Sequence, residues 1–101
     1  MLFHAEAQYE EIEMRTGKYE PVACDCWFTS KGRMKPRFVK MYIQGELCII
    51  PILRVLSEEE RRYAGISVRA YHCVCKDDER LRQFQLLYFK ENCLWKIEWL
   101  S

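Results

Sequence analysis

Residues 33–56 constrain the fold more than any other part of this chain. They read RMKPRFVKMYIQGELCIIPILRVL, with a turn signal at Gln44-Gly45 between two runs of β-branched and aromatic residues. Glycine readily adopts the positive φ that a tight hairpin turn requires, and such flanking runs are typical of strands. We therefore predict two long antiparallel strands, at about 36–43 and 46–56. Pro51 cannot donate a backbone hydrogen bond and predicts a bulge, a bend or a sheet edge.

Alternation of residues with a period of two predicts further strands on both sides of this hairpin. The alternation is typical of half-buried strands and recurs in four segments: 19–29, 66–75, 82–90 and 93–100. In the first segment, Val22, Cys24 and Cys26 lie on one face. The last two segments flank Glu91-Asn92 and predict a second hairpin.

Two helical segments are predicted outside these strands. An apolar stripe recurs at steps of three and four near the N-terminus: Leu2, Ala5, Tyr9 and Ile12. Residues 2–15 are therefore expected to form a short acidic, amphipathic helix. In the segment SEEERRYAG, Ser57 and Glu60 have the spacing of a capping box, which predicts a short helical turn near 58–63.

The number and spacing of these segments indicate the fold class. A chain of 101 residues has the size of one domain and can bury a core without crosslinks. Five to six strands with local connections favour a mainly β fold. We expect a small antiparallel, partly open barrel, SH3-like or similar, because curling hides the edges of a small sheet. Residues 1–18 are expected to form the acidic helix, and residues 19–101 a single β-barrel-like domain.

Composition and the first residues point to a cytoplasmic protein. Half of the residues are apolar, which argues against disorder. Residues 1–20 lack the basic and then apolar pattern of a secretory signal, and no apolar run approaches the roughly 18 to 20 residues that span a bilayer. The six cysteines would then meet a reducing compartment, where free thiols are the norm. We expect no membrane partner.

Several signals between Gly32 and Trp99 follow one another in a characteristic order. They are Gly32 and Pro36 before a strand, the turn at Gly45, the apolar run 52–56, a polar segment closed by Gly65, then Arg69, Tyr71, Leu87-Tyr88-Phe89 and Trp95. This order resembles a family of small, uncharacterised bacterial all-β proteins. The resemblance implies a compact β fold and a bacterial, cytosolic origin, and it implies no activity.

A basic and aromatic segment is the strongest candidate for a binding site. Five bases and no acid lie between Thr29 and Gln44: Lys31, Arg33, Lys35, Arg37 and Lys40. Aromatic residues lie within and beside this run: Trp27, Phe28, Phe38 and Tyr42. Single-stranded nucleic-acid binders combine basic grooves with aromatic platforms in this manner. The alternative is a solvated basic face with the aromatic residues in the core, which a net charge of only +1 favours. The candidate partner-binding residues are the five bases with Trp27 and Tyr42.

The cysteine pairs suggest a metal site, but their spacing argues against one. Cys24 and Cys26, like Cys73 and Cys75, are separated by one residue and face the same way on a strand. Thiolate sites for zinc usually use turns with two to four intervening residues, so buried free thiols are the favoured interpretation. His72 shares a predicted face with apolar neighbours and is expected to pack there. We predict no catalytic residue, no metal ligand and no cofactor.

The distribution of charge suggests two kinds of function. Residues 1–20 carry five acids and two bases, whereas residues 21–55 carry two acids and six bases. The first hypothesis is a non-enzymatic binding module that meets an acidic partner, either protein or nucleic acid, through the basic segment. The alternative is a self-assembling protein whose N-terminal helix docks on the basic face of its own chain or of a neighbouring copy. A thiol metal or redox site is a third hypothesis.

Overall fold

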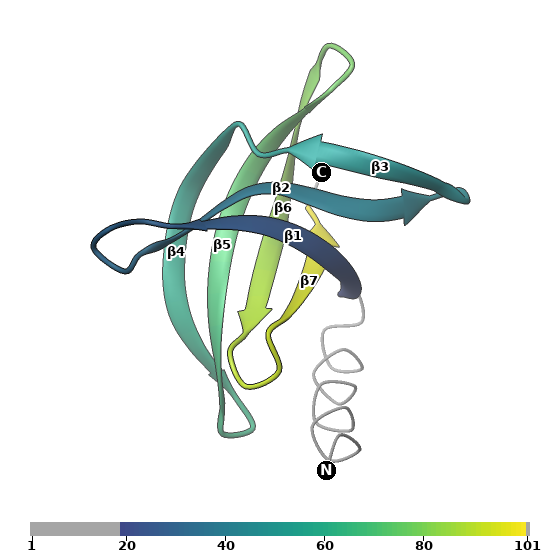
Figure 1. The fold of residues 1–101 in the computed structure, drawn as a ribbon. Helices are drawn as coiled ribbons and strands as arrows, with labels where there is room; N and C mark the ends of the chain where they lie inside the picture. Colours follow the sequence, from purple (N-terminus) through teal and green to yellow (C-terminus); the bar gives the residue numbers. More distant parts are fainter. Residues whose placement is uncertain (1–18, 101) are drawn as a thin grey trace.

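The computed structural model describes residues 19–100, which form one curled sheet of seven antiparallel strands (Figure 1). The strands are β1 (Glu20–Phe28), β2 (Met34–Ile43), β3 (Glu46–Pro51), β4 (Arg54–Tyr63), β5 (Ile66–Asp77), β6 (Arg80–Phe89) and β7 (Leu94–Trp99). Their order across the sheet is β3-β2-β1-β7-β6-β5-β4, so β3 and β4 are its two edges. The predicted mainly β, antiparallel, barrel-like fold is thus confirmed, with seven strands in place of five to six.

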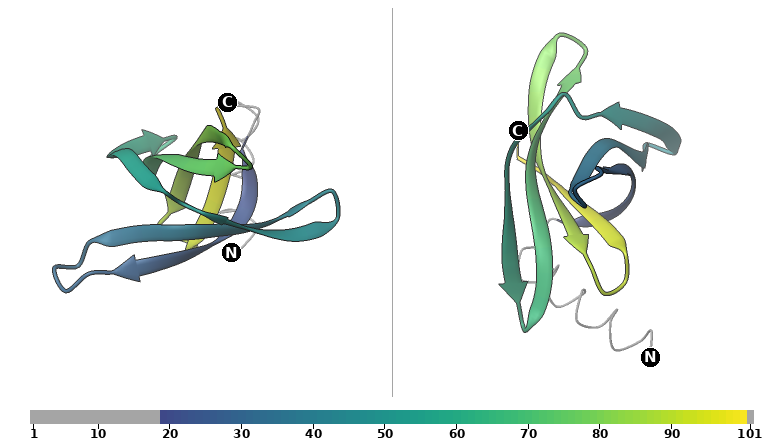
Figure 2. Two further views of the ribbon diagram at one scale, coloured as in Figure 1. Left: turned by 90° about the horizontal axis from the view of Figure 1, so that it is seen from above. Right: turned by 60° about the vertical axis from the view of Figure 1, so that its left-hand side comes forward.

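The link between β3 and β4 joins the two edges of the sheet across its open side. The Ile52 amide donates to the Arg37 carbonyl oxygen, and the Leu53 amide donates to the Val74 carbonyl oxygen, each at 2.8 Å. Two adjacent residues therefore bond to opposite halves of the sheet. These bonds hold the sheet in the curled, partly open shape that Figure 2 shows from two further directions.

The concave side of the sheet holds the larger hydrophobic core. Its buried members come from β2, β5, β6 and β7: Val39, Met41, Tyr71, Cys73, Cys75, Phe84, Leu86, Trp95 and Ile97. Strands β2 and β5 are not neighbours in the sheet, so their side chains meet across its concave side. The rings of Tyr88 and Trp95 lie 4.6 Å apart between centroids, within the range in which aromatic pairs stabilise a core.

A second buried cluster uses the alternate residues of β5 and β6. It consists of Tyr19, Ile66, Val68, Ala70, Leu87 and Phe89. Val68 and Ala70 alternate with Arg69 and Tyr71, which project to the concave side. Strand β5 therefore buries apolar side chains on both of its faces.

The turn predicted at Gln44-Gly45 is confirmed. Both residues have positive φ, 53° at Gln44 and 84° at Gly45, as a two-residue turn between twisted antiparallel strands requires. This turn sets the register in which Ile43 pairs with Glu46 and Tyr42 with Leu47.

The predicted strand 46–56 is wrong in its second half. Strand β3 ends at Pro51, and the chain turns through Ile52-Leu53 before β4 begins at Arg54. The prediction of a bend or edge at Pro51 is confirmed. Apolar residues continue through the corner, so the alternation of the sequence does not mark it.

The helical turn predicted near 58–63 is also wrong, because these residues belong to β4. The Glu60 carboxylate lies 2.9 Å from the Arg69 guanidinium on β5 and 2.7 Å from the Lys90 amino group that follows β6. Alternate residues of β4 thus meet partners outside their own segment. These cross-strand ion pairs, together with the backbone ladder to β5, prevail over a local capping signal.

The predicted N-terminal helix lies outside the described residues. Among residues 19–100, no helix is long and apolar enough to cross a membrane.

A substitution at the turn between β4 and β5 tests the corrected assignment. Ala64 is exposed and has a φ of 49°, a conformation that costs alanine about 1 kcal/mol and that asparagine tolerates well. We expect Ala64→Asn to raise the free energy of unfolding by up to about 1 kcal/mol, measured by urea unfolding. A loss of stability would contradict a two-residue turn at this position.

Candidate functional site

The outer face of β1, β2 and β3 carries most of the predicted binding residues. Directly opposite residues of antiparallel strands project to the same face, and the pairing places Trp27 opposite Lys35, and Lys40 opposite both Ala23 and Ile49. The intervening side chains Cys24, Val39 and Met41 pack into the concave core. The residues between them therefore point outward. We call this surface the basic–aromatic face: Trp27, Lys35, Arg37, Phe38, Lys40, Tyr42, Leu47 and Ile49.

The aromatic rings of this face are open to solvent and lie beside cations. Trp27 is 60% exposed and Tyr42 is 71% exposed. The Arg37 guanidinium lies 5.4 Å from the centre of the Trp27 ring, and the Lys40 amino group lies 5.8 Å from that of Phe38. Both distances fall within the range of cation–π attraction. The face thus interleaves flat apolar rings with positive charge.

A β-bulge explains the position of Arg37. Cys26 pairs with Pro36, whereas Asp25 pairs with Phe38, so Arg37 is the extra residue on β2. Bulges of this kind re-aim a side chain and increase the local twist. Here the extra residue brings the guanidinium over the Trp27 ring.

Two predicted site residues do not join this group. Arg33 forms an ion pair with Glu58 of β4 at 2.6 Å, which ties the β1–β2 turn to the far edge of the sheet. Lys31 lies in the exposed turn between β1 and β2. Phe28, which flanks the basic run in the sequence, pairs with Met34 and projects to the face opposite that of Trp27. The structure therefore places five of the seven predicted residues on one face of β1 and β2: Trp27, Lys35, Arg37, Lys40 and Tyr42.

Leu47 and Ile49 extend the face and were not predicted to belong to it. They are 58% and 56% exposed, although both are large apolar residues. The sequence could have shown that Leu47 and Ile49 join this face, because a two-residue turn at Gln44-Gly45 fixes Leu47 opposite Tyr42 and Ile49 opposite Lys40. Beside Tyr42 lies a shallow hollow of about 350 Å³ lined by Pro21, Val22, Ala23, Lys40, Met41, Tyr42 and Leu47.

A separate groove lies where the sheet fails to close. It has a volume of about 530 Å³ and is lined by residues 34–36 of β2, residues 52–58 and Tyr71. Tyr71 is buried, and its hydroxyl makes no hydrogen bond of ordinary geometry within residues 19–100. The Arg69 guanidinium bonds Glu58 and Glu60, each at 2.9 Å.

A network of charged side chains lies on the concave side around Glu60 of β4. Glu60 accepts hydrogen bonds from the Lys90 amino group at 2.7 Å, from the Ser67 hydroxyl and from Arg69. These contacts lower the pKa of Glu60 to about 2, with Lys90 the largest cause. The carboxylate is therefore charged at neutral pH and compensated by two cations.

Four free cysteines, the Cys24/Cys26 and Cys73/Cys75 pairs of the sequence, line the core. Cys24 and Cys26 pack against the cluster that contains Cys73 and Cys75. Burial, reinforced by neighbouring thiols, raises the pKa of Cys24 and of Cys73 to about 12. His72 lies elsewhere, with its Nε2 atom 2.7 Å from Gln83 Oε1. Within residues 19–100, no three His, Cys, Asp or Glu side chains are grouped so as to hold a metal ion.

Comparison with protein-family models, with curated proteins and with solved structures gives no match. The resemblance to small bacterial all-β proteins therefore stays a prediction.

Alkylation of the native protein tests the state of the thiols. The thiolate is the reactive species, and a pKa of about 12 leaves roughly one thiol in ten thousand ionised at pH 8. We expect iodoacetamide to modify the exposed Cys93 first and to spare Cys24 and Cys73 until the protein unfolds, as measured by peptide mass spectrometry. Modification of Cys24 at the rate of Cys93 would contradict this and would revive a thiol redox site.

Proposed function

We propose that this protein is a non-enzymatic binding module whose basic–aromatic face binds single-stranded nucleic acid. The observation that carries the proposal is the exposure of Trp27 and Tyr42 on the same strand face as Lys35, Arg37 and Lys40. Large aromatic side chains left in water lose the gain of burial, so their presence on a surface favours a partner that covers them.

Stacking is the contact that suits these rings. Every nucleic-acid base has an apolar, polarisable face, and base–aromatic stacking contributes about 1–3 kcal/mol per base. Trp27 and Tyr42 lie at different positions along β1 and β2, so they offer platforms for two different bases. Phe38 lies between them on β2 and is half-buried.

The cations suit the phosphate backbone that links such bases. Lys35, Arg37 and Lys40 all lie on β2. One acid, Asp25 of β1, lies on the same face, opposite Phe38. The local charge is therefore positive although the whole chain is close to neutral. Such a patch attracts a polyanion and makes its binding depend on salt.

An acidic protein segment is the competing partner for the same face. The cations would attract carboxylates as well as phosphates, and residues 1–20 of a second copy carry such charge. Stacking separates nucleic acid from a purely acidic peptide, because such a peptide has no flat apolar group to place on the rings of Trp27 and Tyr42.

The proposal predicts salt-dependent binding that also depends on the rings. With labelled mixed-sequence single-stranded DNA and RNA, fluorescence anisotropy should show an affinity that falls as salt rises. Trp27→Ala and Tyr42→Ala should each weaken binding about tenfold or more without changing the salt slope. Lys40→Gln should reduce the slope of log K against log salt by about 0.7.

Matched variants on other surfaces serve as controls. Phe28→Ala removes a ring that is 63% exposed on the opposite face, and Lys76→Gln removes an exposed cation at the end of β5. Both should bind as the wild type does. Wild-type affinity in Trp27→Ala, or no binding at low salt, would overturn the nucleic-acid proposal. Binding of polyglutamate in place of nucleic acid would establish the acidic protein partner.

A further inference from the structure

Strand β4 offers an unpaired edge that the basic–aromatic face does not use. Among the strands of residues 19–100, β4 pairs with β5 along one side and ends the sheet on the other. The β1–β2 hairpin crosses β4 at mid-height, where Arg33 pairs with Glu58, and the lower part of the strand lies clear of it (Figure 1). Within the described part of the chain, residues 58–63 make no backbone bond beyond the β4–β5 ladder, so a row of donors and acceptors is open to another strand from Glu58 to Tyr63.

The charges of this edge follow an unusual order. The strand carries three acids and then two bases, from Glu58 to Arg62. Charged side chains on an edge normally discourage pairing, because like charges meet in most registers. This order is self-complementary when two copies run antiparallel, because the acidic half of each strand then lies beside the basic half of the other.

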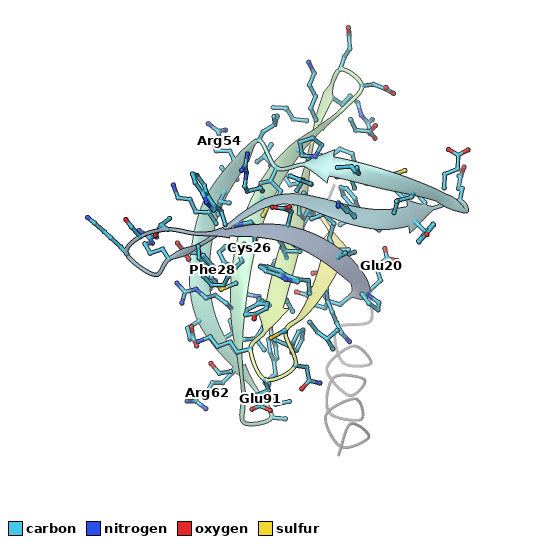
Figure 3. The ribbon with its side chains drawn as sticks, viewed as in Figure 1. Glu20, Cys26, Phe28, Arg54, Arg62 and Glu91 are labelled. Carbon is cyan, nitrogen blue, oxygen red and sulfur yellow. The ribbon has the colours of Figure 1, made fainter. Side chains whose placement is uncertain are left out.

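Sheet geometry selects the register. Two copies related by a twofold axis perpendicular to the sheet must place inner side chains opposite inner ones and outer opposite outer. Centring the pair on Glu60 satisfies this condition: Glu59 faces Arg61 on the outer side, and Glu58 faces Arg62 on the inner side. Figure 3 shows Arg62 pointing away from the lower end of β4. The neighbouring register, centred on Arg61, would leave Glu59 opposite Tyr63.

The one like-charged pair in this register is already compensated. Glu60 would meet Glu60 of the second copy, but each carboxylate lies 2.7 Å from its own Lys90 and 2.9 Å from its own Arg69. The four remaining charge contacts all join opposite charges, and the two that involve Glu58 add to its ion pairs with Arg33 and Arg69 of the same chain.

We propose that two copies of this chain pair through their β4 strands, antiparallel and centred on Glu60, to form one continuous sheet. The occupant of the edge is a second copy because the charge order complements itself. This inference is independent of the proposed function, because the basic–aromatic face lies on β1 to β3.

Charge reversal with reciprocal rescue tests the proposal. In sedimentation equilibrium, Glu59→Arg and Arg61→Glu should each raise the dimer dissociation constant about tenfold or more, because two attractive contacts become repulsive. An equimolar mixture of the two variants should form heterodimers, since every outer contact is then again between opposite charges. The double variant Glu59→Arg/Arg61→Glu should dimerise as the wild type does.

Two further measurements keep the test independent of folding defects. Arg61 is half-buried and bonds Tyr63 and Gln85, so circular dichroism must show that its variant is folded. Arg62 is exposed, and Arg62→Glu should also weaken the dimer by placing acids opposite Glu58. A wild-type protein that is monomeric at millimolar concentration would overturn the proposal. Dimers that Arg62→Glu and Glu59→Arg leave unchanged would overturn it as well.

Discussion

The rest of the structure depends on the way β1 is shared between two groups of strands. Glu20–Val22 pair with β7, whereas Ala23–Phe28 pair with β2. In the described sheet, β1 is therefore the link between the β2–β3 hairpin and the four-stranded meander of β4 to β7. Because side chains alternate along a strand, this pairing also decides which side chains of β1 enter the core.

The alternation along β1 separates two kinds of chemistry. Cys24 and Cys26 point inward, where burial raises their pKa values and keeps them as thiols. Trp27 points outward and joins the cations of β2. A slip of one residue would exchange the two sets, burying charge and exposing thiols, at a cost that the apolar core could not offset. The inert interior and the proposed binding face are thus consequences of one register.

Much of this architecture could be predicted from the sequence, because alternation and turn residues are local signals. The strands around Val39 and His72, the C-terminal hairpin and the turn at Gln44-Gly45 all followed from such signals. The corner at Ile52-Leu53 did not, because apolar residues run through it on both faces. The segment near Glu60 satisfied a helix-capping pattern, and its true partners, Arg69 and Lys90, lie 9 and 30 residues further along the chain.

The candidate site shows the same division between local and distant information. The membership of Trp27, Lys40 and Tyr42 in one face follows from period and register. The ion pair that draws Arg33 away from this face to Glu58 could not be predicted in this way, because 25 residues and a sheet corner separate the two. The bulge that carries Arg37 over Trp27 was also missed, although Pro36 beside it cannot donate a backbone hydrogen bond and is a residue type that marks bulges.

Nuclear Overhauser contacts across β1 test this account most directly. The register predicts backbone contacts between Val22 and Trp95 on one side of β1, and between Cys24 and Val39 on the other. Both sets of contacts in one spectrum would show that β1 joins the two groups of strands with its thiols inward. Contacts displaced by one residue, or the absence of the set between β1 and β7, would contradict the sheet and the binding face built on it.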